Sequence, residues 1–134
     1  LNFELLGSVY QTAGSLGNKE AYPNAVLSYE KASQLNPQNP GLKLAIAGSL
    51  FAQGKTAEAK TFALEALSLK EDYIDALIML SQISKSQGSN TEAISYAERA
   101  LSYDPSNKNI SQYLNSLKNS PSASTPSPVE NSAN

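Results

Sequence analysis

The sequence predicts an all-α fold: an α-solenoid of three helix-turn-helix repeats, followed by a capping helix and a disordered tail. Three observations predict it: a period of 34 residues, apolar residues at helical spacing within each period, and glycine or proline where helices should end. Two sets of small residues carry the period, namely Ala25, Ala59 and Ala93, and then Ala32, Ala66 and Ala100. Because both sets share one separation, the register does not slip.

Each repeat is expected to form two helices joined by a tight turn. In the second repeat, apolar residues at helical spacing flank the polar stretch 53–56, "QGKT". Gly54 and Gly88 fall where a residue in the left-handed region can close a first helix. Thr56 and Asn90 follow them and are predicted to cap the second helices.

The ends and the packing of the second helices can also be predicted. Pro37 and Pro105 follow the second helices of their repeats, where a fixed φ and a missing N–H prevent the helix from continuing. The alanines are expected at helix crossings, because axes that approach to about 8 Å need small residues there. Together these features predict paired helices that pack closely along seams of alanine.

The first repeat begins with "FELLGSVY" at residues 3–10 and continues with "AVLSYEKASQLNP" at 25–37. With its aromatic residue, Leu-Gly pair, Tyr, small residues and closing Pro, it resembles the tetratricopeptide repeat family, whose unit is 34 residues long. The resemblance places repeats near 1–39, 40–73 and 74–107. The two halves of the first repeat fit together only if about six residues are inserted within 14–24. An uninterrupted frame is the alternative, and it would use Val9, Thr12, Ala13 and Leu16.

The segment after Pro105 predicts an end to the stack. Residues 108–119 carry apolar side chains at helical spacing, so we expect a capping helix that covers the apolar face of the last repeat. Residues 120–134 are rich in Ser and Pro and almost free of apolar residues, which predicts a disordered tail. The domain is therefore expected to span 1–119.

Composition argues against several function classes. The net charge is −2 and the basic residues form no cluster, so nucleic acid is not an expected partner. No run approaches the roughly 18 apolar residues of a membrane span, so this segment is not expected to enter a membrane itself. With neither His nor Cys, the commonest bases and metal ligands are missing, and we expect no enzyme activity, cofactor or metal. The acidic residues are interpreted as structural: Glu71, Asp72 and Asp75 near a helix start, and Glu58, Glu92 and Glu98 on solvated surface.

Binding is what a curved stack of helix pairs can do, because the first helices line a concave groove. Helical spacing in the second repeat assigns three residues to this groove, the 34-residue period assigns three more, and the inserted frame completes the set. The predicted groove residues are Leu44, Gly48, Phe51, Ile78, Gln82, Lys85, Glu4, Ser8 and Gln11. An alternative for Leu44 and Phe51 is packing against a neighbouring helix. Some family members hold a peptide carboxylate with paired Lys and Asn in this groove; Leu44 and Gly48 stand at two such places, so that clamp is expected to be missing.

Two functional hypotheses follow. The first is a non-catalytic protein–protein interaction module that binds a peptide or helix of a partner. The second rests on residues 39–88, which are similar to the helical-repeat tails of bacterial O-antigen ligase and polymerase-like membrane proteins. There the repeats would dock or space, the glycan chemistry would lie upstream of Leu1, and membrane association would come from upstream segments. Self-association through the repeat ends is a further expectation. No residue indicates a cell compartment.

Overall fold

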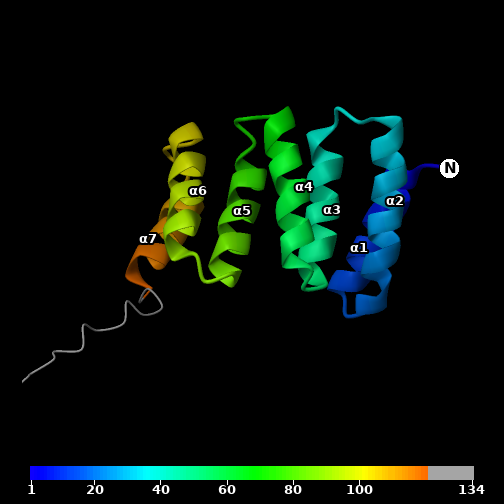
Figure 1. Cartoon of the computed structure of the whole chain (residues 1–134), viewed down its shortest axis with the longest axis horizontal. Helices are drawn as coiled ribbons and strands as arrows, with labels where there is room; N and C mark the ends of the chain where they lie inside the picture. Colours follow the sequence, from blue (N-terminus) through cyan, green and yellow to red (C-terminus); the bar gives the residue numbers. More distant parts are fainter. Residues whose placement is uncertain (121–134) are drawn as a thin grey trace, which may run out of the picture.

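The computed structural model describes residues 1–120, and within them every regular element is helical (Figure 1). The elements are α1 (Phe3–Ser15), η1 (Lys19–Ala21), α2 (Tyr22–Leu35), α3 (Pro40–Ala52), α4 (Thr56–Leu69), α5 (Ile74–Ser86), α6 (Asn90–Tyr103) and α7 (Lys108–Asn119). The disordered tail predicted for residues 120–134 lies outside the described residues, apart from Ser120.

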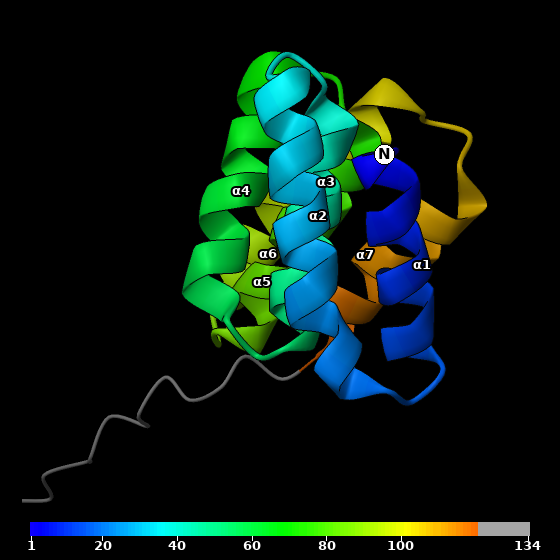
Figure 2. The ribbon, with the colours of Figure 1, turned by 90° about the vertical axis from the view of Figure 1, so that its right-hand side faces the viewer.

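The helices form a stack of antiparallel pairs. α1 packs on α2, α3 on α4 and α5 on α6, and each pair then packs on the next through α2 with α3 and α4 with α5. Figure 2, a view from the α1–α2 end, shows α2 and α4 toward one side of the stack and α1 toward the other. The predicted all-α solenoid of helix pairs is confirmed.

The turns inside the pairs close as predicted at glycine, but the capping prediction is wrong. Gly54 and Gly88 have φ of 76° and 79°, in the left-handed region that glycine adopts without a side-chain clash. Thr56 and Asn90 are the first residues of α4 and α6, not their caps. The Thr56 hydroxyl donates to the carbonyl of Gly54 at 3.3 Å, and the Asn90 amide donates to the carbonyl of Leu117 in α7 at 3.2 Å. Both side chains therefore act as donors to carbonyl groups, whereas a cap accepts from helix amides.

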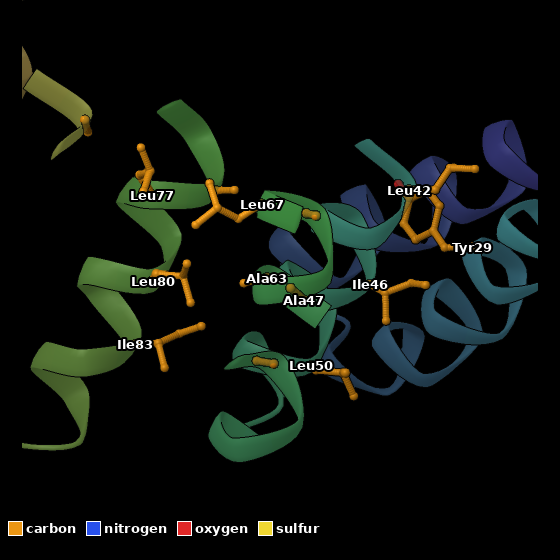
Figure 3. Close-up of a cluster of buried hydrophobic side chains, with 14 of the residues drawn as sticks. Tyr29, Leu42, Ile46, Ala47, Leu50, Ala63, Leu67, Leu77, Leu80 and Ile83 are labelled. Carbon is orange, nitrogen blue, oxygen red and sulfur yellow. The ribbon is translucent and has the colours of Figure 1, made fainter. Parts of the chain in front are cut away.

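Alanine lines the seams between helices, as the period predicts. Ala25, Ala59 and Ala93 are completely buried, and so are Ala66 and Ala100. Larger side chains fill the spaces between the seams and join the three pairs into one core (Figure 3); they include Leu42, Ile46, Leu50, Leu67, Leu77, Leu80 and Ile83.

In the first repeat, burial follows the frame with the insertion. Leu6 and Gly7 face inward, whereas Val9 and Leu16, which the uninterrupted frame would bury, are 57% and 83% exposed. Gly7 lies directly beneath the ring of Tyr29, because a Cβ built on Gly7 would come within 2.7 Å of Tyr29 Cδ1. The equivalent positions in the second repeat, offset by 40 residues in the first helix and 34 in the second, are Ala47 and Ala63. Where the second helix pair has two alanines in contact positions, the first pair has a glycine packed against an aromatic ring.

The extra residues of the first repeat lengthen the link from α1 to α2, whereas α1 itself has 13 residues, as α3 does. The link runs from 16 to 21 and includes η1, whereas the link between α3 and α4 runs only from 53 to 55. The last turn of α1 packs on α2 at Gly14, where a Cβ would lie 2.6 Å from the ring of Tyr22. Nothing in the family pattern predicts this second contact of glycine with tyrosine.

The last helix, α7, continues the period of the first helices. Its buried residues Ile110, Leu114 and Leu117 lie 34 positions after Ala76, Leu80 and Ile83 of α5. Its start is capped by the Asn107 side chain, which accepts from the amide of Ile110 at 3.2 Å. The Tyr113 hydroxyl and the buried Ser81 hydroxyl lie 3.1 Å apart and share a hydrogen bond. The helix predicted to cover the last repeat is therefore present and tied to α5.

Candidate functional site

The nine predicted groove residues lie on the first helices α1, α3 and α5, with different degrees of exposure. Glu4, Ser8, Gln82 and Lys85 are exposed, whereas Gln11, Leu44, Gly48, Phe51 and Ile78 are half-buried. The three apolar members, Leu44, Phe51 and Ile78, pack partly against the core. Both interpretations of Leu44 and Phe51 therefore describe part of their environment.

Three of the first helices meet at Gly48, in the middle of this face. A Cβ placed on Gly48 would lie 3.4 Å from Nε2 of Gln11 in α1 and 3.7 Å from Cε of Met79 in α5. Both values are ordinary contact distances, so the surface above Gly48 is close to its neighbours but not filled. Met79 was not among the predicted groove residues, although it follows Ile78 on α5 and so lies at the edge of the predicted set.

Tyr29 fixes the orientation of the Gln11 side chain. The Tyr29 hydroxyl donates to Oε1 of Gln11 at 2.9 Å. Burial raises the pKa of Tyr29, a hydrogen bond with Ser8 acts against this rise, and the charge of Glu4 adds to it. The phenol therefore remains a donor, and Gln11 must accept through its oxygen. Its amide N–H groups then lie toward Gly48, where they can donate to a ligand carbonyl.

A hollow of about 470 Å³ lies away from this face, between α2, α3 and α4. Among its lining residues are Lys43 and Phe62. The ammonium of Lys43 lies 5.7 Å from the centre of the Phe62 ring and forms an ion pair of 3.0 Å with Glu65. The sequence analysis did not predict this hollow. Its signal was Lys43 itself, which stands where the family pattern has an aromatic residue.

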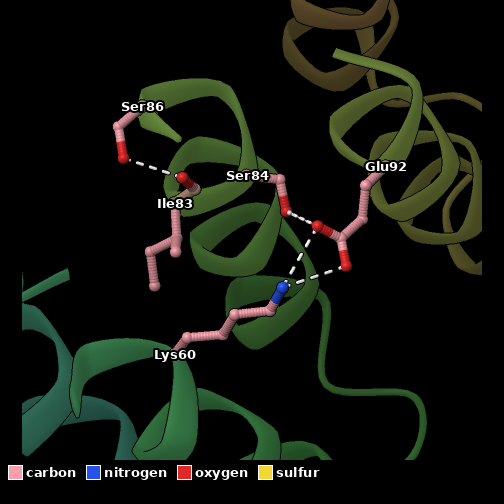
Figure 4. Close-up of polar contacts among 5 residues, drawn as sticks. All are labelled: Lys60, Ile83, Ser84, Ser86 and Glu92. Carbon is pink, nitrogen blue, oxygen red and sulfur yellow. Dashed lines mark hydrogen bonds and ion pairs between the residues drawn. The ribbon is translucent and has the colours of Figure 1, made fainter. Parts of the chain in front are cut away.

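Glu92 keeps 39% of its side chain exposed, as expected of a surface residue, but neighbouring helices also hold its carboxylate. Its carboxylate accepts from Lys60 of α4 at 3.0 and 3.1 Å and from Ser84 of α5 at 2.9 Å (Figure 4). These hydrogen bonds, that of Lys60 first and that of Ser84 second, lower the pKa of the Glu92 carboxyl group below its ordinary value. The three groups link the second and third helix pairs.

The acidic residues near the third pair surround a helix start. Glu71 and Asp72 precede α5, and Asp75 lies in its first turn, where the helix dipole favours negative charge. Within residues 1–120, no group of three or more acidic side chains is arranged to hold a metal ion. No helix in the same range is both long and apolar enough to cross a membrane.

Comparison with known families agrees with the period and the helix pairs. Two family models, each described as tetratricopeptide repeat, match residues 19–83 and 74–107. The chain belongs to the tetratricopeptide repeat family. The matches begin after α1, where the six-residue insertion interrupts the family pattern. The described part of the chain is therefore a tetratricopeptide repeat domain.

The relatives that this chain matches are much larger proteins, and each match covers only a small part of their length. The chain is 27% identical over 105 residues to human protein O-mannosyl-transferase TMTC1. This match covers 78% of the chain and 11% of the human protein. The chain is also 29% identical over 108 residues to mouse superkiller complex protein 3. This match covers 75% of the chain and 6% of the mouse protein. The chain thus spans about a tenth or less of these relatives.

Solved tetratricopeptide repeat structures share the fold. A thermophilic TPR protein of Thermus thermophilus matches with a TM-score of 0.80 and 20% identity, covering 87% of this chain and 62% of that one. The TPR2B domain of yeast Sti1, in a complex with pHsp70, matches at 0.74 and 19% identity, covering 86% and 89%. The first TPR of Spaghetti (RPAP3), bound to the HSP90 peptide SRMEEVD, matches at 0.68 and 24% identity, covering 86% and 92%.

Proposed function

We propose that the concave face of α1, α3 and α5 binds a peptide or a helix of a partner protein. The observation that carries this proposal is the arrangement around Gly48, where the oriented amide of Gln11 and the flexible thioether of Met79 flank a position without a side chain. A ligand backbone can approach closely at a glycine, the Gln11 N–H groups can donate to its carbonyl, and methionine adapts to varied apolar side chains.

The partner segment is proposed to be largely apolar. Leu44, Phe51 and Ile78 offer half-buried apolar surface around Gly48, and Glu4 and Lys85 place opposite charges at the edges of the face. Related domains are described with HSP90 and pHsp70 ligands. This chain places Leu44 and Gly48 where a carboxylate clamp would need polar donors. We therefore expect the acidic peptide SRMEEVD to bind weakly, if at all.

Gly48 allows a direct test of this proposal. Peptides selected from a random displayed library on the wild-type domain would be titrated against wild type and Gly48→Arg by fluorescence anisotropy. The arginine fills the centre of the face without backbone strain, because Gly48 lies within α3 and a Cβ there meets only ordinary contacts. We expect affinity to fall at least about tenfold, equivalent to about 1.4 kcal/mol.

The matched control is Ala57→Arg, which adds the same charge at an exposed residue of α4 outside the predicted face. It should leave the affinity unchanged. Selected peptides that bind Gly48→Arg as tightly as wild type would contradict the proposal. SRMEEVD serves as the comparison ligand, and tight binding of it would contradict the proposed apolar preference.

A second proposed function is that of a docking or spacer tail attached to a larger membrane-embedded glycan ligase or polymerase-like enzyme. The observation in its favour is the match to a protein named as an O-mannosyl-transferase, of which the repeat region is a small part. The coding sequence upstream of Leu1 tests it. Several runs of about 18 or more apolar residues would support a membrane-embedded enzyme, and their absence would contradict it.

A further inference from the structure

The two ends of the helical stack differ in the chemistry of their exposed residues. On α7, every exposed residue is polar or charged: Lys108, Asn109, Gln112, Asn115, Ser116, Lys118 and Asn119. At the other end, α1 and the residue after it expose Leu5, Val9 and Leu16, with fractional exposures of 62%, 57% and 83%. The α7 end is built to meet water, and the α1 end is not.

The exposed residues of α1 occupy positions that later repeats use for packing. Val9 corresponds to Ser49 of α3 and Ile83 of α5, which are both completely buried. Leu5 corresponds to Met79 of α5, which lies against the preceding pair at Gly48. At Leu5 and Val9 the outer face of α1 therefore repeats a packing surface, and no other helix within residues 1–120 covers it.

The spacing along this face is symmetric. Leu5, Val9, Thr12 and Leu16 follow one another at intervals of four, three and four residues. If α1 met an antiparallel copy of itself about a two-fold axis, Leu5 would lie opposite Leu16 of the second copy, and Val9 opposite its Thr12. Self-complementary surfaces of this kind form the two-fold contacts that are commonest in homo-oligomers.

Charge is compatible with this arrangement. Glu4 is the one charged residue of α1, and antiparallel pairing places the two Glu4 side chains at opposite ends of the contact. At a rise of 1.5 Å per residue they lie about 20 Å apart along the axis, beyond a Debye length at physiological salt. A parallel pair would instead place the two carboxylates side by side. We propose that the outer face of α1, defined by Leu5, Val9, Thr12 and Leu16, docks on the same face of a second copy in antiparallel orientation.

Sedimentation equilibrium on the 134-residue chain tests the association. The contact is small, so the dimer is expected to dissociate on dilution within a range of about 1 mM to about 1 μM. Val9→Arg places a charge near the two-fold axis and should weaken association at least about tenfold. The control Leu64→Arg changes an exposed leucine of α4, in the next pair, and should associate like wild type. A monomer at all concentrations, or equal effects of the two variants, would overturn the proposal.

Cysteine cross-linking tests the orientation, because the natural sequence contains no cysteine. A mixture of Leu5→Cys and Leu16→Cys chains should form a disulfide-linked dimer. Leu5→Cys alone should cross-link much more slowly, because antiparallel pairing separates the two introduced thiols by about 16 Å along the axis. Equally fast cross-linking of Leu5→Cys alone would overturn the antiparallel arrangement. Gly48→Arg should leave association unchanged, so this result is separable from binding at the concave face.

Discussion

Replacement of Gly7 by alanine should destabilise the first helix pair, although alanine is the better helix former. The added Cβ would lie 2.7, 2.8 and 2.9 Å from three carbons of the Tyr29 ring, all well inside normal contact. The ring is 4% exposed and its hydroxyl is bonded to Gln11, so it has little room to move. Overpacking costs about 1–3 kcal/mol, and the gain in helix propensity returns roughly 1, which leaves a net loss of up to about 2 kcal/mol.

Urea unfolding followed by circular dichroism measures this loss, with Gly48→Ala as the matched control. Gly48 also lies within a first helix, but a Cβ there would meet only contacts of 3.4 Å and longer. The control should therefore gain up to about 1 kcal/mol from helix propensity alone.

A second variant pair tests the cause of the effect. In a Tyr29→Ala background the ring is absent, and the two positions resemble Ala47 and Ala63 of the second repeat. There, Gly7→Ala should become stabilising by up to about 1 kcal/mol. If Gly7→Ala and Gly48→Ala shift the urea midpoint in the same direction by the same amount, or if Tyr29→Ala leaves the effect of Gly7→Ala unchanged, the packing argument is refuted.

Three further predictions concern the packing between helices and can be measured by urea unfolding. Because the carboxyl group of Glu92 has a lowered pKa in the folded state, its contribution is present above the unfolded-state pKa and is lost as the pH falls through the folded value. Wild type should therefore lose more stability than Glu92→Gln between about pH 7 and about pH 3; equal losses would show that the bonds from Lys60 and Ser84 contribute nothing. The buried hydroxyl of Ser49 has no hydrogen-bond partner among residues 1–120, so Ser49→Ala should raise stability by about 1 kcal/mol, and a lower midpoint would contradict this. Ala59 is completely buried in its seam, so Ala59→Leu should cost about 1–3 kcal/mol, and an unchanged midpoint would mean that the helices do not approach closely there.

The period made much of the fold predictable, because it reports contacts that recur in every repeat. Ala59 and its equivalents are small since helices cross there, and Gly54 has a positive φ since the chain must turn between antiparallel helices. Each of these structural requirements acts on a single position and restricts the residue types that can stand there. The inserted frame was predictable for the same reason, since Leu6 and Gly7 keep the pattern of a buried helix face.

Contacts that join two distant residues were not predictable in the same way. Glu92 resembles any surface glutamate until α4 brings Lys60 within 3.0 Å of it. Gly14 has the neighbours of a loop glycine in the sequence, yet it lies within α1 beneath Tyr22. For the predicted groove, helical spacing in the sequence indicated which helix face lines it. The hydrogen bond from Tyr29 that orients Gln11 could not be predicted, because it depends on the side-chain directions of residues in two helices.

The in-register geometry of α7 shows how little separates this helix from the first helix of a repeat. Three residues of α7, Ser111, Asn115 and Lys118, stand 34 positions after Leu77, Ser81 and Ser84, the last two of which bond to α6. On α7 the same positions carry side chains that need no following helix. A few side chains therefore distinguish α7 from the first helix of a repeat, although its buried residues keep the same register. Lengthening this scaffold would be a matter of editing that one face and appending a partner helix, with the preceding pairs left untouched.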